Sequence, residues 1–169
     1  MPQVCLLFFL ATTALVAGAE TLPQWQIVPE ESHLTFTGTQ NNAPVTGEFK
    51  QFTAEIGADS DNFKAISIHI VVDMNSISAS YADLKATLSA SDWFDVKAFP
   101  KADFKATQLN KTNGNTYEAQ GTLTIRDKSV PVTLTFTVDF SKKNHAIVDG
   151  HTTLKRKSFG CCSAIAIRA

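Results

Sequence analysis

The sequence predicts an all-β fold, and two stretches with two-residue periodicity are the main reason. Val130–Phe140 places an apolar side chain at every second position and mostly threonines between them, as a strand with one apolar face requires. Tyr117–Ile125 repeats this alternation, and the polar segment 126–129 that joins the two has the length of a hairpin connection. Together the two stretches predict an antiparallel ribbon whose apolar face covers either a core or a guest molecule.

Six further strands are expected from the same alternation and from the turn residues that bound it. They are Trp25–Val28, His33–Gln40, Val45–Ile56, Phe63–Met74, Ala102–Leu109 and Ala146–Leu154. The apolar positions change parity between Phe49 and Phe52, which predicts a bulge near Gln51. Asp149 and Gly150 fit either a tight turn or a bulge inside the last strand, and the bulge is favoured.

One segment has helical spacing instead. Ser80–Ser91 places Tyr81, Leu84 and Leu88 three and four residues apart, and its alanines, leucines and lysine favour a helix with Ser80 as N-cap. Eight strands with one helix inserted between them are compatible with a barrel or a sandwich.

Size and composition fit a single globular domain. A chain of 169 residues with 44% hydrophobic and 18% charged residues is long enough for one sizeable core. Its net charge of −1 provides no basic field for nucleic acid or anionic lipid. Twelve phenylalanines against two tyrosines and two tryptophans favour a dry interior.

The first nineteen residues read as a secretory signal peptide, which leaves a domain at 20–169 and no membrane span after cleavage. Val4–Val16 is apolar but short for a span, and Ala17–Ala19 has the small-x-small form of a cleavage site. No Lys or Arg precedes the apolar run, so either the amino terminus alone supplies the positive end or the start of the chain is misplaced. A buried N-terminal strand is the alternative interpretation.

Cysteine usage agrees with a fold held by its core. Removal of the signal removes Cys5 and leaves the neighbours Cys161 and Cys162, which are too close for relaxed disulfide geometry. A metal or redox role for this pair is the alternative, although nothing nearby completes a ligand set.

Catalytic chemistry has little support in the sequence. The four histidines fall on different strands or turns, and no nucleophile-elbow, zinc or phosphate-loop motif is present. His69 is expected as a solvated side chain on a polar strand face, and Asp92 and Asp95 as helix-end charges. No enzyme activity, metal or cofactor is therefore predicted.

The order of short motifs from Trp25 to Gly160 resembles the YceI family. The motifs are His33-Leu34-x-Phe36, Val45-x-Gly47-x-Phe49-x-x-Phe52-x-Ala54-x-Ile56, Asp73-Met74-x-Ser76-Ile77, Leu88-x-x-x-Asp92-Trp93-Phe94-Asp95, Phe99-Pro100-x-Ala102-x-Phe104, Gly121-x-Leu123-Thr124-Ile125, Val130-Pro131-Val132 and Arg156-x-x-Phe159-Gly160. The resemblance implies an eight-stranded antiparallel lipocalin-like barrel with one inserted α-helix. It also implies that the lumen holds a polyisoprenoid lipid, an isoprenoid quinone or alcohol, in a periplasmic or secreted bacterial protein.

The carboxyl-terminal segment departs from the family pattern. After Gly160 the chain reads Cys161-Cys162-Ser163 and ends at Ala169, and Ser158 stands where the family usually has aspartate. A frameshifted or truncated terminus would explain this. It would leave the first strand or its neighbour without a partner, an edge through which the protein could dimerise.

The expected function is non-enzymatic binding and transport or storage of the lipid. A filled barrel that binds a protein partner, such as a membrane redox protein, is the second hypothesis, and an enzyme acting on the lipid is the third. The predicted ligand-binding residues lie on the apolar strand faces, with four from the helix region covering one mouth. They are Phe36, Ile66, Ile68, Ile70, Val72, Leu84, Leu88, Trp93, Phe94, Phe104, Leu123, Ile125, Val132, Leu134 and Phe136.

Overall fold

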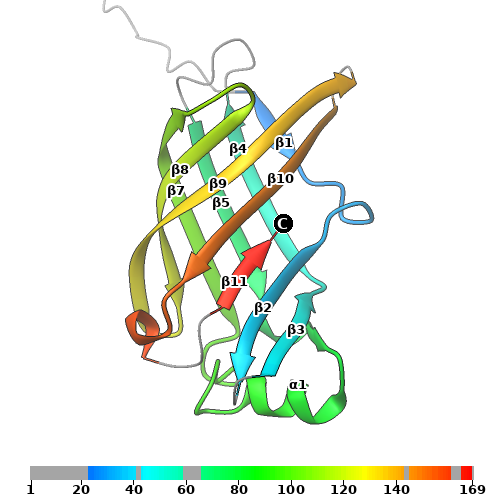
Figure 1. Cartoon of the computed structure of the whole chain (residues 1–169), viewed down its shortest axis with the longest axis vertical. Coiled ribbons are helices and arrows are strands. Elements are labelled where there is room, and N and C mark those ends of the chain that lie inside the picture. The colour runs from blue at the N-terminus through cyan, green and yellow to red at the C-terminus, as the bar shows by residue number, and fades with distance from the viewer. Residues whose placement is uncertain (1–22, 41–42, 59–65, 143–144, 161–164, 169) are drawn as a thin grey trace, which may run out of the picture.

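A computed structural model describes most of the chain, and a single antiparallel sheet dominates it (Figure 1). The described residues are 23–40, 43–58, 66–142, 145–160 and 165–168. The predicted signal segment and the Cys161–Cys162 pair lie outside these ranges.

Eleven strands form the sheet in the described part of the chain, in the order β1-β4-β5-β7-β8-β9-β10-β11-β2-β3-β6. Their bounds are β1 Gln24–Gln26, β2 Leu34–Gln40, β3 Ala43–Phe49, β4 Phe52–Ala58, β5 Ile66–Asp73, β6 Ile77–Ala79, β7 Lys101–Lys111, β8 Thr116–Ile125, β9 Lys128–Lys142, β10 His145–Leu154 and β11 Ile165–Arg168. Two short 3-10 helices, Met74–Ser76 and Arg156–Phe159, and one α-helix, α1 Ala82–Ser89, complete the fold.

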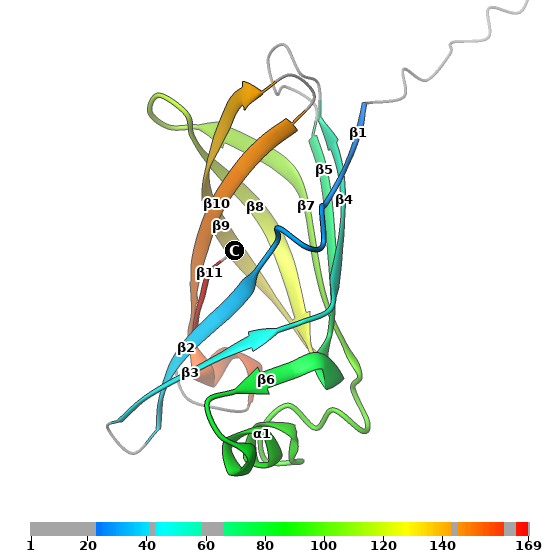
Figure 2. The ribbon, with the colours of Figure 1, turned by 90° about the vertical axis from the view of Figure 1, so that its right-hand side faces the viewer.

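The predicted number of eight strands differs from eleven chiefly because long strands are bent. Strand β3 leads into β4 after only two residues, and β5 leads into β6 through one short 3-10 helix. Since β3 pairs with β6 and β4 pairs with β5, the two bent strands run side by side around one corner. This shared corner joins the two ends of the sheet order, so the sheet curls into a barrel (Figure 2).

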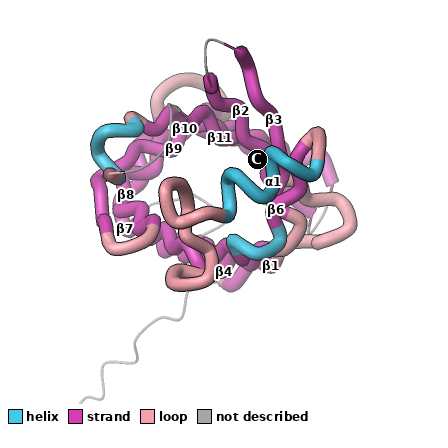
Figure 3. The backbone as a smooth tube through the Cα atoms, turned by 90° about the horizontal axis from the view of Figure 1, so that it is seen from below, coloured by secondary structure: helices cyan, strands magenta, loops and turns pink. Residues whose placement is uncertain are grey.

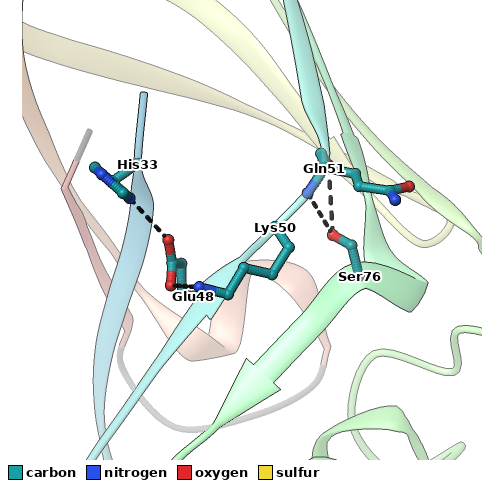
Figure 4. Close-up of polar contacts among 5 residues, drawn as sticks. All are labelled: His33, Glu48, Lys50, Gln51 and Ser76. Atoms are coloured by element: carbon teal, nitrogen blue, oxygen red, sulfur yellow. Dashed lines mark hydrogen bonds and ion pairs between the residues drawn. The ribbon is translucent and has the colours of Figure 1, made fainter. Parts of the chain in front are cut away.

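Polar contacts hold the corner where β3 turns into β4 (Figure 4). The amide of Gln51 donates to the Ser76 hydroxyl at 3.0 Å, and the same hydroxyl donates to the Asp73 carbonyl at 2.6 Å. Backbone bonds from Lys50 N to Ser76 O and from Asp73 N to Gln51 O, 3.2 Å and 3.0 Å long, continue the pairing across the break. The bulge predicted near Gln51 is in the structure a break between two strands, at the position where the parity changes.

The far side of the barrel is completed by β11. It pairs with β10 from His151↔Arg168 to Leu154↔Ile165, and with β2 from Gly38↔Ile165 to Thr35↔Arg168. The first strand or its neighbour was expected to lack a partner. The first strand, β1, pairs with β4 and ends the sheet order, so one of its edges has no partner strand in the described part of the chain, whereas β2 is paired on both sides because the four residues of β11 bridge it to β10. A dimer formed through an unclosed edge stays a prediction.

Strand β10 runs through Asp149 and Gly150 without a turn or a bulge at that point. These residues oppose Thr137 and Phe136 in regular register, and the register shifts instead between His145 and Ile147. Both interpretations of the Asp149-Gly150 pair were therefore wrong. Gly150 is needed for close packing, because a Cβ there would lie 3.1 Å from the Phe136 Cβ.

Helix α1 lies across one end of the barrel, here called the lower end, as Figure 3 shows from below. It begins two residues later than predicted, with Tyr81 at the N-cap and no capping side chain, so the prediction of Ser80 as N-cap was wrong. Ser80 instead bonds the Thr46 side chain on β3 at 3.4 Å. In the described part of the chain, no helix is both long and apolar enough to cross a membrane.

Candidate functional site

The interior of the barrel is lined by one face of each strand, and the register identifies that face. Leu123 opposes Phe104 and Val130, and residues directly opposite each other share a face. The same reasoning places the alternating apolar residues of β4, β5, β7, β8 and β9 inside. The interior therefore has an almost wholly apolar wall.

Two glycines allow phenylalanine rings to lie flat against this wall. A Cβ at Gly47 would be 2.4 Å from Cζ of Phe36, and a Cβ at Gly121 would be 2.7 Å from Cζ of Phe104. Each ring therefore occupies the space that a side chain on the neighbouring strand would fill. The two rings therefore cover the backbone of the neighbouring strands at these glycines.

Several inner-face side chains at mid-barrel are only half-buried. They are Ile70, Val72, Val130, Val132 and Leu134. In a barrel packed solid by its own side chains, these central positions would be fully buried. Their partial exposure shows that solvent reaches part of this apolar inner face.

The lower end is closed by tightly packed apolar side chains. Leu84 and Leu88 of α1 are 2% and 1% exposed, and Phe94 from the following loop is 3% exposed. Phe94 meets the ring of Phe49 edge-on at 6.3 Å, and Phe49 meets Phe36 at 5.3 Å. Helix, loop and barrel wall thus share one core at this end.

Arg126 fastens the loop after α1 to the turn between β8 and β9. Its Nη1 donates to the carbonyls of Ser91 at 3.1 Å and Trp93 at 2.9 Å, and the guanidinium lies 5.7 Å from the centre of the Phe99 ring. Its Nε is buried without a hydrogen-bond partner. The backbone at Arg126 has a φ of 59°, a left-handed conformation suited to a tight hairpin turn.

The upper end is much more open than the lower end. Phe140 and Val148, both on the inner face by register, are 43% and 48% exposed. The Phe140 ring meets Trp25 of β1 at 6.0 Å, although β1 and β9 are not neighbours in the sheet. Deeper down, Tyr117 stacks on Phe136 at 5.8 Å. This end offers aromatic side chains around an accessible mouth.

One basic side chain also reaches the inner face at the upper end. Lys111 opposes the buried Tyr117 in the β7–β8 ladder, and its Nζ lies 5.6 Å from the centre of that ring. It faces inward because the register shifts between Ala106 and Gln108. Sequence reasoning missed this residue, since strict alternation from Phe104 places position 111 outside.

The sequence-predicted residues fall into two groups in the structure. Ten lie on the inner face of the barrel, namely Phe36, Ile68, Ile70, Val72, Phe104, Leu123, Ile125, Val132, Leu134 and Phe136. Leu84, Leu88, Trp93 and Phe94 gather at the lower end, as expected for a cover over one mouth. Ile66 opposes Ala58 in the β4–β5 ladder, but its side chain lies outside the described part. Contact of these residues with a ligand stays a prediction.

The outer wall carries the polar groups. His69 faces outward as expected, but it is hydrogen-bonded rather than simply solvated, with Nε2 2.6 Å from Asp103 Oδ2. Partial burial raises the pKa of Asp103, but the hydrogen bond and charge of His69, together with Lys105, outweigh that effect and lower it. Within the described ranges, no group of three His, Cys, Asp or Glu side chains could hold a metal ion.

A second outer-wall contact lies beside the bent corner (Figure 4). Glu48 accepts hydrogen bonds from Lys50 and from His33 Nδ1, the latter at 3.0 Å. The Lys50 bond and then the His33 bond hold the pKa of Glu48 below its usual range. Neither outer-wall group faces the interior. Both contact other side chains of the outer wall and would not contact a ligand inside the barrel.

An antiparallel barrel with an apolar interior, covered at one end by a helix, defines the lipocalin-like class predicted from the sequence. The model of the YceI-like domain matches residues 25–168. The chain therefore belongs to the YceI-like domain family.

Curated relatives and solved structures agree with this assignment. A UPF0312 protein of Yersinia pestis is 32% identical over 88 residues, which cover 52% of this chain and 45% of the relative, so the match spans about half of that protein's length. A UPF0312 protein of Pseudomonas putida is 26% identical over 159 residues, covering 89% of this chain and 83% of the relative.

Two solved structures show the same fold. The crystal structure of Burkholderia cenocepacia BcnA superposes with a TM-score of 0.78 at 25% identity, covering 84% of this chain and 96% of that one. A polyisoprenoid binding domain from Saccharophagus degradans superposes with a TM-score of 0.60 at 10% identity, covering 80% and 89%.

Proposed function

We propose that this protein binds a polyisoprenoid lipid, with the prenyl tail inside the barrel. The observation that carries the proposal is the apolar inner face of the barrel, on which Val132, Leu134 and Ile70 are only partly buried. The polyisoprenoid binding domain of the same fold supports the choice of ligand class. The ligand is an isoprenoid quinone or alcohol, or a close chemical relative of these.

The energetics favour such a guest. Burial of each methylene contributes about 0.8 kcal/mol, so several isoprene units gain on the order of 10 kcal/mol before ordering costs. The apolar wall offers a prenyl chain little hydrogen bonding, so the tail is selected by shape and hydrophobicity alone. Inside the barrel, a tail that is insoluble in water would be shielded from water during transport.

The role is that of a carrier or store rather than an enzyme. Among the described residues, the interior has apolar walls and no candidate pair of acid and base, and the polar pairs His69–Asp103 and His33–Glu48 lie on the outer wall. We propose export to the periplasm or beyond, and the signal-like first nineteen residues support this. A carrier in that compartment would move prenyl lipids across an aqueous gap.

The test is mass spectrometry of an organic extract from the purified protein. Wild type is expected to yield a prenyl lipid in near-stoichiometric amount. Val132→Trp, which fills the interior, should lose it, while Thr133→Trp, on the exposed outer face of the same strand, should retain it. A wild-type extract without lipid, from protein that also fails to take up added geranylgeraniol, would reject the proposal and favour a filled barrel that binds a protein partner.

A further inference from the structure

We propose that the upper part of β10, His145–Gly150, is a docking edge for an extended segment of a protein partner in which apolar and basic residues alternate. The partner segment would add to the sheet as a further strand, on the side of β10 that faces away from β9. This inference goes beyond lipid binding and does not depend on it.

Strand β10 has two neighbours along only part of its length. It pairs with β9 from His145 to His151, but with β11 only from His151 to Leu154. In the described part of the chain, no strand pairs with residues 145–150 on the side of β11. Figure 1 shows β11 stopping partway up β10, between β10 and the segment that joins β1 to β2.

The backbone of Val148 points to this side. In an antiparallel strand, the N–H and C=O of one residue point the same way, and successive residues alternate. The N–H of Val138 donates to the Asn115 carbonyl at 3.1 Å, which lies on the β8 side of β9. Val138 therefore makes no ladder bond to β10, and Val148, directly opposite it, must point its own N–H and C=O away from β9.

The side chains of this edge are apolar on both faces of the sheet. Ile147 opposes Asp139 on the outer wall and is 51% exposed, whereas Val148 faces inward and is 48% exposed. The sequence from His145 to Gly150 contains no lysine, arginine or proline, the residues that most often prevent an edge strand from pairing. The edge therefore offers an incoming strand both backbone hydrogen bonds and apolar contact.

The charge beside the edge selects the partner. The segment between β1 and β2 carries the exposed residues Glu30 and Glu31, and Glu31 Oε2 lies 4.0 Å from His145 Nε2 on β10. A strand added to β10 would lie beside these carboxylates, where basic side chains are favoured. A second copy of the chain would instead bring its own Glu30 and Glu31 to the same place, which like-charge repulsion opposes.

Two labelled hexapeptides test the proposal, one alternating lysine with valine and one alternating glutamate with valine. Both alternate in the same way and differ only in charge. Fluorescence anisotropy should show that wild type binds the lysine peptide about tenfold more tightly. Amide hydrogen exchange should slow at Val148 when the lysine peptide is bound.

Val148→Pro removes the outward N–H without removing a ladder bond to β9, so it should weaken binding of the lysine peptide about tenfold. Val148→Thr keeps both the N–H and the β-branched shape and is the matched control, which should bind as wild type does. Glu31→Gln should reduce the preference for the lysine peptide without altering the backbone. Urea denaturation checks that Val148→Pro is folded, and if it is not, the Glu31→Gln result decides.

Three results would overturn the proposal. Failure of wild type to bind the lysine peptide would reject the docking edge, and equal affinity for the two peptides would reject the basic partner. Dimers of wild type in sedimentation experiments that Val148→Pro abolishes and Val148→Thr preserves would assign the edge to a second copy instead.

Discussion

The two ends of the barrel are built from the same kinds of apolar residue but differ in how completely these are covered. At the lower end, Leu88 is 1% exposed and lies among α1, its following loop and the barrel wall. At the upper end, Phe140 is 43% exposed although it continues the same apolar face of β9. The difference shows that alternation alone creates the wall, while an added element decides which end is closed.

The comparison predicts unequal costs for deleting apolar side chains. Leu88→Ala should lower the free energy of unfolding by about 2–5 kcal/mol, because it leaves a cavity in a packed core. Phe140→Ala should lower it by about 1 kcal/mol, because that ring is largely solvated and loses mainly its contact with Trp25. Urea denaturation of both variants measures the difference, and equal losses would show that the two ends are packed alike.

Substitution of Arg126 tests what holds α1 and its following loop over the lower end of the barrel. Arg126→Ala removes both bonds to the loop after α1 and should cost about 1–3 kcal/mol. It should also expose Trp93, measured as increased acrylamide quenching in a Trp25→Phe background. Lys128→Ala, in the same turn but paired only with its neighbour Asp127, is the control and should leave quenching unchanged. Unchanged quenching in Arg126→Ala would show that the cover stays closed without the arginine.

The smallest effect is expected on the outer wall, away from both ends. The folded pKa of Asp103 lies below its ordinary value of 3.8. Its pairing with His69 therefore stabilises the fold above that value and is lost as the pH falls through the lowered one. Asp103→Asn should cost about 1 kcal/mol or less at neutral pH.

The difference in stability between wild type and Asp103→Asn should narrow as the pH falls below 3.8 and through the lowered pKa of Asp103, as measured by urea midpoints across the pH range. Asp92→Asn, an exposed site after α1, should show no such convergence. A gap that stays constant down to low pH would contradict the role assigned to the ion pair.

Strand alternation was sufficient to predict the wall of the barrel. Strand β8, Thr116–Ile125, contains all of the predicted Tyr117–Ile125, and β9 contains all of Val130–Phe140. The parity change between Phe49 and Phe52 located the corner correctly. These predictions succeeded because a strand between an apolar interior and water must alternate over its whole length.

The features that were missed depend on contacts distant in the chain. Nothing local marks the register shift in β7, so Lys111 at the mouth could not be recognised. The short strands β6 and β11 have three and four residues, too few for periodicity to stand out, and they are set by their partners. Ser80 has the chemistry of an N-cap, but its bond to Thr46 on β3 takes it away from the helix.

The pairing of β11 with β2 has a consequence for how the protein assembles. It places Arg168, the last described residue, opposite Thr35, which lies near the start of the chain. By contrast, β7, β8, β9 and β10 pair with one another in the order in which they follow in the sequence. Local hairpins form before long-range pairs because less chain entropy is lost. During synthesis the barrel therefore cannot close between β10 and β2 until β11 emerges, and the apolar inner faces of these two strands should stay in contact with water until then.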